Sequence, residues 1–223
     1  MDVRGKTAIV TGSAVGVGRA TAIDLAKRGA NVVINYSRSE DDAKEAVRLV
    51  EAEGAGALLV RADVSDDAQV QSMVRQAVDA FGGLHILVNN AAMTHFVPFQ
   101  DLDGMKAEYW DDIFSVNVKG AFFCARAGAK AMKQSGGGAI VNIASVAGVR
   151  AIGSSIAYAA SKAALINMTV ALARILGPDI RVNAVAPGFI ETRWLRSGLG
   201  DQIYEAGKAM QIKQAPLKAV CQP

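Results

Sequence analysis

Residues 7–18 read TAIVTGSAVGVG, an apolar run that passes through three glycines into a helix-forming stretch. Glycines at such a turn let backbone N–H groups approach a phosphate, and the helix N-terminus adds partial positive charge. The spacing is GxxxGxG, whereas the usual dinucleotide fingerprint is GxGxxG. The strand–turn–helix context still favours a nucleotide-binding loop over a simple tight turn. The predicted contacts are Gly12, Ser13, Gly16, Val17 and Gly18.

Outward from this segment, short apolar runs rich in Val and Ile alternate with longer helical stretches. Continuous apolar strands are typical of a sheet covered on both faces. Strict alternation of strand and helix predicts an α/β fold with a doubly wound parallel sheet in three α/β/α layers. The helix over 107–134 is long for a globular domain, so we expect it to be broken or to pack against a neighbour. The expected strands are 7–11, 31–36, 57–62, 86–89, 139–144 and 181–185; the expected helices are 17–28, 41–53, 66–81, 107–134 and 156–176, with tail helices between 191 and 212.

Composition predicts a single globular domain over residues 1–223, with 51% hydrophobic and 20% charged residues. The net charge of +3 and the absence of a basic run argue against nucleic acid as a partner. No apolar stretch reaches about 18 uncharged residues, so we expect no membrane span. The N-terminus lacks a signal-peptide layout, which favours the cytoplasm. Cys124 and Cys221 are expected to be free thiols, Cys124 in the core, and no metal site is expected.

The end of the second strand bears on which nicotinamide dinucleotide would fit. In NAD-binding folds an acidic residue there holds the ribose 2′-hydroxyl, but residues 35–38 contain no Asp or Glu. Arg38 suits a 2′-phosphate, because a guanidinium matches phosphate geometry. The segment with Tyr36, Ser37 and Arg38 therefore favours NADP(H) over NAD(H). The alternative is that Arg38 is only a solvated loop charge.

Polar residues also follow the third and fourth strands. Asp63, next to Val64, is placed either to accept a hydrogen bond from an adenine amino group or to cap the following helix. Asn89 and Asn90 form an amide pair, and Ala91 and Ala92 follow. These small residues let a cofactor lie close to the backbone. Because ligands of open α/β sheets bind beyond the carboxyl ends of the strands, we expect all these positions at one edge.

Tyr158 and Lys162 stand four residues apart, one turn along a single helix face. A phenol is a weak acid or base near neutrality, and a nearby ammonium favours the phenolate and lowers its pKa. With Ser145 able to hydrogen-bond a reacting carbonyl oxygen, the group predicts a proton-transfer unit. A solvated surface pair is the alternative.

Taken together, these motifs resemble the short-chain dehydrogenase/reductase family over residues 4–218. The resemblance implies a Rossmann-type sheet, a nicotinamide cofactor and a catalytic tetrad of Asn117, Ser145, Tyr158 and Lys162. It implies that Tyr158 is the acid in reduction, Ser145 orients the carbonyl, Lys162 lowers the phenol pKa and holds the cofactor ribose, and Asn117 holds a water. Read without the family, Asn117 kinks or caps its helix. The matching motifs are 11–18, 63–64, 89–91, Asn117, Ser145, Tyr158 with Lys162, and 181–188.

Further residues take roles from the same resemblance. Pro187, Gly188, Ile190 and Thr192 are expected against the nicotinamide and its phosphates, with a substrate lid over about residues 189–215. The chain looks similar to 3-oxoacyl-carrier-protein reductases and related ketoreductases. This favours an oxidoreductase that acts on a hydrophobic ketone or a 3-oxoacyl thioester. One alternative is an NAD-dependent sugar or secondary-alcohol dehydrogenase. The other is a nucleotide-binding protein without turnover, acting as a redox sensor or subunit. The expected substrate-facing residues are Met93, Thr94, His95, Phe96, Val149, Arg150, Ile152 and Trp194.

The resemblance also concerns the end of the sheet. Family members usually continue beyond the position of Pro223 with a helix and a seventh strand, so we expect that strand to be missing and a sheet edge exposed. We expect a homo-oligomer, a dimer or a tetramer.

Overall fold

The computed structural model describes residues 2–223 and contains a parallel sheet of six strands in the order β3-β2-β1-β4-β5-β6. Each neighbouring pair is parallel and in continuous register. The sheet reverses its winding between β1 and β4, as the alternation of strands and helices predicted. The strands are β1 Thr7–Val10, β2 Asn31–Tyr36, β3 Ala57–Arg61, β4 Ile86–Asn89, β5 Gly138–Ile143 and β6 Ile180–Val185.

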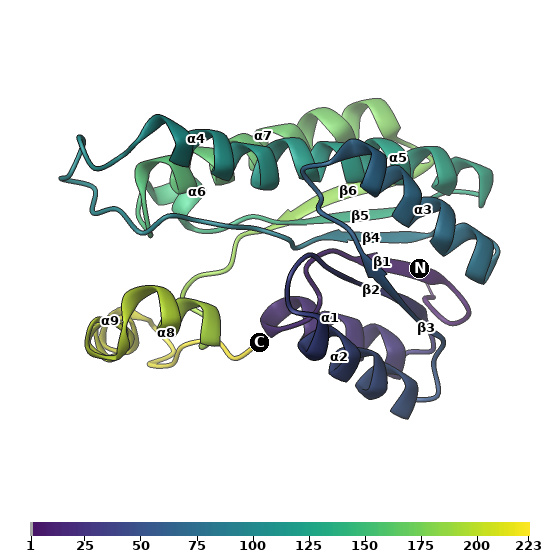
Figure 1. Ribbon diagram of the computed structural model, residues 1–223, viewed down its shortest axis with the longest axis horizontal. Helices are drawn as coiled ribbons and strands as arrows, with labels where there is room; N and C mark the ends of the chain where they lie inside the picture. Colours follow the sequence, from purple (N-terminus) through teal and green to yellow (C-terminus); the bar gives the residue numbers. More distant parts are fainter. Residues whose placement is uncertain (1) are drawn as a thin grey trace.

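The helices cover the two faces of the sheet unequally (Figure 1). On one face lie α1 Gly16–Lys27 and α2 Glu40–Ala52. On the other lie α3 Asp67–Phe81, α4 Ala107–Phe114, α5 Ala121–Gln134 and α7 Ile156–Leu176. The short helix α6 Ala147–Arg150 follows β5, and α8 Arg193–Leu199 and α9 Asp201–Gln214 lie beyond one end of the sheet. The expected three layers and tail helices are confirmed.

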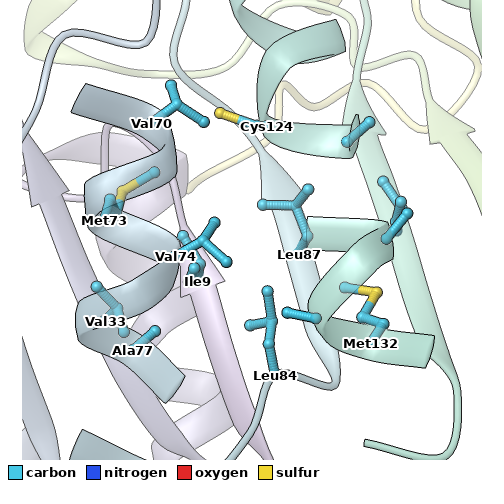
Figure 2. Packing of buried hydrophobic residues seen from close by; sticks show 14 of the residues in the cluster. Ile9, Val33, Val70, Met73, Val74, Ala77, Leu84, Leu87, Cys124 and Met132 are labelled. Carbon is cyan, nitrogen blue, oxygen red and sulfur yellow. The ribbon is translucent and has the colours of Figure 1, made fainter. Parts of the chain in front are cut away.

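The main core lies between the sheet and helices α3 and α5 (Figure 2). Ile9 and Leu87 from the strands meet Met73 of α3 and Met132 of α5, and all four are fully buried. Cys124 points into the same cluster and is 1% exposed, and burial raises the pKa of its thiol to about 12. The prediction that Cys124 is a packing residue is confirmed.

The long helix expected over 107–134 is broken. Between α4 and α5 the backbone forms a π-helical segment, Ser115–Gly120. Its hydrogen bonds run from residue i to i+5, so its turn is wider than that of an α-helix and takes up an extra residue. Gly120 ends it, and a Cβ there would lie 2.8 Å from Val64 Cγ2. This close packing ties the helix to the segment after β3.

The face of β4, β5 and β6 opposite α5 and α7 is left partly open. A groove of about 480 Å³ runs there beside α1, lined largely by apolar side chains including Val17, Val141 and Pro187. Val185 on β6 is 51% exposed. Within residues 2–223 the sheet ends at β6, with no seventh strand, as expected.

Candidate active site

The glycine loop between β1 and α1 has the backbone geometry of a phosphate cradle. Gly12 and Gly16 adopt φ of 61° and 56°, values that favour glycine. A Cβ on Gly12 would lie 2.9 Å from Ala91 Cα, and one on Gly18 would lie 2.6 Å from the Gly12 carbonyl oxygen. Val15, the N-cap of α1, makes no side-chain capping hydrogen bond. The first backbone N–H groups of the helix therefore stay available to donate to an anion. The loop therefore fits a dinucleotide diphosphate.

Two side-chain amides hold this loop in place: buried Asn35, which sequence reasoning did not single out, and partly buried Asn90. Asn35 Oδ1 accepts from Gly12 N at 3.0 Å, and Asn35 N donates to Ser13 Oγ at 3.0 Å. Asn90 Nδ2 donates to the carbonyl oxygens of Thr11 and Gly12 at 2.9 and 3.0 Å. Ser13 is thus fully buried against β2, and its backbone N–H donates to the Asn35 carbonyl oxygen at 3.0 Å, so Ser13 shapes the loop from within. Asn35 could have been recognised as an amide inside an otherwise apolar strand.

Other predicted cofactor residues present the backbone only. The Val17 side chain lines the apolar groove rather than the loop. Asn89 is 4% exposed, and its Nδ2 donates to Asn142 Oδ1 at 2.9 Å and to the Ala121 carbonyl oxygen at 3.2 Å. Its amide therefore joins β4 to β5 and α5 and is turned away from the cofactor edge.

The residues after β2 and β3 differ in whether their side chains already have hydrogen-bond or ion-pair partners within the protein. Ser37 and Arg38 are exposed, and among residues 2–223 Arg38 has no ion-pair partner within 4 Å. Asp63 Oδ1 accepts from Ser65 N and Ser65 Oγ at 2.9 and 2.7 Å. The cap of α3 is Asp66, whose side chain accepts from the backbone of the first turn, so the alternative that Asp63 caps this helix is wrong.

The candidate catalytic side chains come together where β5 ends and α7 begins. Ser145, just beyond β5, accepts from Ala147 N at 3.1 Å, and its hydroxyl lies close enough to the Tyr158 phenol to lower the pKa of that group. Ser155 caps α7 by accepting from Tyr158 N at 3.2 Å, which fixes where the tyrosine leaves the helix. Lys162 lies one turn further on and is 2% exposed.

The charges in this cluster differ from expectation in one respect. Lys162 Nζ donates to the Ile143 carbonyl oxygen at 2.7 Å and lies 5.6 Å from the Tyr158 ring centre. Burial lowers the pKa of Lys162 to about 8. Burial also raises the pKa of Tyr158, an effect that the Ser145 hydrogen bond partly offsets. The expected lowering of the phenol pKa by Lys162 is therefore not found, and Tyr158 is protonated at neutral pH.

Asn117 lies in the π-helical segment and braces the site. Its Oδ1 accepts from Met93 N at 2.9 Å, and its Nδ2 donates to the Met93 carbonyl oxygen and to Ser161 Oγ, each at 3.0 Å. Both amide hydrogens are used, so the side chain joins the loop after β4 to α7. The water that the resemblance assigns to Asn117 stays a prediction.

The segment after β6 crosses the glycine loop and contacts α2. A Cβ on Gly16 would lie 3.6 Å from Thr192 Cγ2, which places Thr192 against the loop, and its contact with a cofactor stays a prediction. The next residue, Arg193, donates to Asp42 Oδ2 at 2.6 Å. Arg19 donates to the other carboxylate oxygen, Asp42 Oδ1, at 3.2 Å. Sequence reasoning missed this bridge, whose ends are 151 positions apart.

The first residues of the segment after β6 are held by backbone hydrogen bonds to other parts of the chain. Ile190 pairs with Cys221 as an isolated parallel bridge, and Glu191 N donates to the Cys221 carbonyl oxygen at 2.9 Å. The Pro187 carbonyl oxygen accepts from Val146 N at 3.0 Å, close to Ser145, while the exposed Gly188 has nothing within 4 Å of an added Cβ. The predicted lid thus begins beside the catalytic cluster and continues into α8 and α9.

The expected substrate-facing residues lie in three different places. Trp194 packs against the rings of both Tyr158 and Phe96, and Met93 lies in the loop after β4 that Asn117 holds. His95 instead stacks on Tyr109 at 3.9 Å between ring centres, and its Nε2 lies 2.9 Å from Asp112 Oδ2. Val149, Arg150 and Ile152 are exposed on and after α6.

Comparison with known proteins agrees with this geometry. A family model described as short chain dehydrogenase matches residues 6–201. A candidate ketoacyl reductase of the granaticin polyketide synthase from Streptomyces violaceoruber is 44% identical over 191 residues, which cover 85% of this chain and 75% of that protein. The 3-oxoacyl-[acyl-carrier-protein] reductase FabG of Staphylococcus aureus is 38% identical over 213 residues, covering 95% and 83%.

A solved structure from Sinorhizobium meliloti 1021, described as a candidate short-chain alcohol dehydrogenase, superposes with a TM-score of 0.90 at 36% identity. The match covers 99% of this chain and 85% of that one. The family match spans the glycine loop, the strand ends and the helix α7 that form the candidate site. The chain therefore belongs to the short-chain dehydrogenase family of oxidoreductases.

Proposed function

We propose that the protein is an NADP(H)-dependent ketoreductase that interconverts a ketone and a secondary alcohol, with a 3-oxoacyl thioester among the candidate substrates. The observation that carries the proposal is the grouping of Ser145, Tyr158 and buried Lys162 where β5 ends and α7 begins, at the same carboxyl edge of the parallel sheet as the glycine loop. The names of the Streptomyces and Staphylococcus relatives support the substrate class.

Each side chain has a defined part in the chemistry. The nicotinamide, when bound, supplies the hydride for reduction and accepts it for oxidation. In reduction, Tyr158 donates its phenolic proton to the carbonyl oxygen, while Ser145 hydrogen-bonds that oxygen and holds it toward Tyr158. The raised pKa of Tyr158 keeps this proton available through neutral pH. Lys162 ties α7 to the end of β5 through its hydrogen bond to the Ile143 carbonyl oxygen, and Asn117 joins α7 to the loop that carries Met93.

The catalytic role of Tyr158 can be tested with Tyr158→Phe, which keeps the ring and removes the proton. We expect this variant to bind NADPH with near-normal affinity in a fluorescence titration and to lose most carbonyl reduction, about a hundredfold or more. Unchanged turnover would refute the acid role. Binding of NADPH without turnover of any carbonyl compound by the wild type would favour a sensor or subunit instead.

The preference for NADP(H) rests on Arg38, which is exposed, lacks an ion-pair partner among residues 2–223 and follows a strand end without an acidic residue. A guanidinium there suits a 2′-phosphate. We expect Arg38→Glu to lower the ratio of kcat/KM for NADPH over NADH at least tenfold. Arg75→Glu, which changes the same charge at an exposed site on α3, is the control. A wild type that prefers NADH would contradict the assignment.

We also propose that the protein works as a homo-oligomer in the cytoplasm. Of the helices in residues 2–223, only α7 is long and apolar enough to cross a membrane by length and composition. However, α7 carries Tyr158 and Lys162 toward the sheet, and its outer face exposes Val170 and Ile175. This apolar outer face suits a second copy of the chain.

The oligomer can be tested by ultracentrifugation of Ile175→Glu, which we expect to dissociate a wild-type dimer or tetramer. Val185→Glu is the matched control, because Val185 is exposed on the opposite side of the sheet. A monomeric wild type would contradict the proposal, and dissociation by Val185→Glu alone would move the interface to the open sheet face.

A further inference from the structure

The lid helix α8 brings an aromatic side chain next to the proposed acid. Trp194 is the second residue of α8, and Thr192 caps this helix by accepting from Leu195 N at 3.3 Å. The Trp194 indole lies 6.4 Å from the Tyr158 ring, between centres, and the two planes are tilted by 43°. The Trp194 side chain is only partly covered by the protein, since the residue is 44% exposed. One part of the indole therefore borders the space in front of the phenol.

Phe96 completes this aromatic surface from the loop after β4. Its ring centre lies 6.0 Å from that of Trp194. The ring is seated against Gly198 of α8, where an added Cβ would lie 2.0 Å from Phe96 Cε2. The loop is held on the other side, because Val97 N donates to the Ser154 carbonyl oxygen at 2.9 Å. Phe96 is thus fixed between the loop and the lid, and only glycine at position 198 leaves room for it.

The position of a reacting carbonyl follows from the site itself. Its oxygen must reach the Tyr158 hydroxyl and Ser145, and Trp194 is the aromatic side chain packed against Tyr158, so a substituent on the carbonyl carbon lies within reach of the Trp194 and Phe96 pair. The nearby candidates for polar contact are directed elsewhere: His95 is paired with Asp112, and Arg150 is exposed on α6. Tilted aromatic side chains pack best against another flat ring.

We propose that Trp194 and Phe96 form a specificity wall that selects carbonyl substrates bearing a flat aromatic or conjugated ring next to the carbonyl. This inference rests on the proposed ketoreductase function and narrows its substrate class. Trp194 acts through packing alone, while the hydride and proton steps stay as described. The wall forms only when α8 lies over the site, because Trp194 and Gly198 both belong to that helix.

The first test compares acetophenone with cyclohexyl methyl ketone, which has the same number of carbon atoms but no aromatic ring. We expect wild-type kcat/KM to favour acetophenone about five- to tenfold, and Trp194→Ala to abolish this preference. Trp194→Phe should restore part of it. Trp110→Phe, which alters the other tryptophan of the chain, should leave the ratio unchanged. An equal ratio in the wild type and Trp194→Ala would overturn the proposal.

The seat of Phe96 offers an independent variant. Gly198→Ala introduces the Cβ that overlaps the Phe96 ring and should lower the aryl preference. The matched control is Gly207→Ala on α9, where the nearest side-chain atom is 3.9 Å away. A loss of preference in both variants would indicate a general disturbance of the lid and would count against the wall.

A binding measurement separates this proposal from the proposed function. In Trp110→Phe the only indole is Trp194, so acetophenone bound in the presence of NADP⁺ should quench its fluorescence, whereas cyclohexyl methyl ketone should quench it far less. If no ketone is turned over, the ketoreductase function fails, but this quenching still supports the wall. Turnover of ketones without selective quenching would refute the wall alone.

Discussion

Replacing Lys162 with methionine should change how the stability of the protein depends on pH. Lys162 is 2% exposed, and its pKa is lowered from 10.5 to about 8 by burial. That difference corresponds to a cost of about 3 kcal/mol for folding with a charged lysine at neutral pH. Between pH 8 and 10.5 the unfolded chain still binds this proton and the folded protein does not, so the free energy of unfolding rises with pH.

The methionine variant lacks this titration. It also leaves the Ile143 carbonyl oxygen without the donor that Lys162 Nζ provides at 2.7 Å, which costs about 1–3 kcal/mol at every pH. The difference in stability between the wild type and Lys162→Met should therefore shift toward the wild type by up to about 3 kcal/mol from pH 7 to pH 10.5. The constant cost cancels in this comparison.

Urea unfolding followed by circular dichroism, at half-unit steps of pH, measures this shift. Lys130→Met is the matched control, because Lys130 is exposed on α5 and its removal should leave the pH dependence unchanged. A stability difference between the wild type and Lys162→Met that stays constant across this pH range would refute the argument that burial lowers the lysine pKa.

Three further predictions concern the site. Ser145→Ala should lower kcat for reduction about a hundred- to a thousandfold with little change in cofactor affinity, as steady-state kinetics and a fluorescence titration would reveal; an unaltered kcat would contradict the role given to the serine. Asn35→Ala should lower the free energy of unfolding by about 2–4 kcal/mol, because the buried loop amide and the carbonyl groups it pairs with lose their partner, and urea unfolding checks this. Arg193→Gln should speed NADPH release about two- to fivefold in stopped-flow measurements at low salt, and the difference should vanish at high salt, whereas Arg28→Gln, which breaks an exposed pair within α1 and its cap, should have no effect.

The parts of the fold that follow local patterns could be predicted from the sequence. The strands and helices were expected because apolar periodicity is a property of neighbouring residues. A break in the helix over 107–134 was one of the two outcomes expected from its length, the other being packing against a neighbour, and neither its π-helical form nor the short helix α6 was foreseen. The glycine loop was recognisable because its spacing and its context lie in one continuous segment.

The contacts that complete the site join positions far apart in the chain. Asn35 braces a loop 23 positions away, and Arg193 meets Asp42 across 151. No local pattern carries such pairings. The direction of a side chain is equally nonlocal: Asn89 was expected at the cofactor edge, but its amide meets Asn142 on the neighbouring strand. The pKa of Tyr158 also depends on burial, which only the packed structure determines.

The π-helical segment Ser115–Gly120 also limits how this region can change in length. An α-helix turns by about 100° per residue and a π-helical segment by less, so the wide turn takes up one extra residue and leaves α4 and α5 in the same rotational phase. Deleting one residue would let a regular α-helix run through with Cys124 still facing the core, but it would remove the wide turn that places Asn117 beside Met93. Substitutions within the segment preserve this arrangement, whereas an inserted residue would rotate α5 by about 100°. For redesign of the protein, the number of residues between α4 and α5 is a stricter constraint than the identity of most of them.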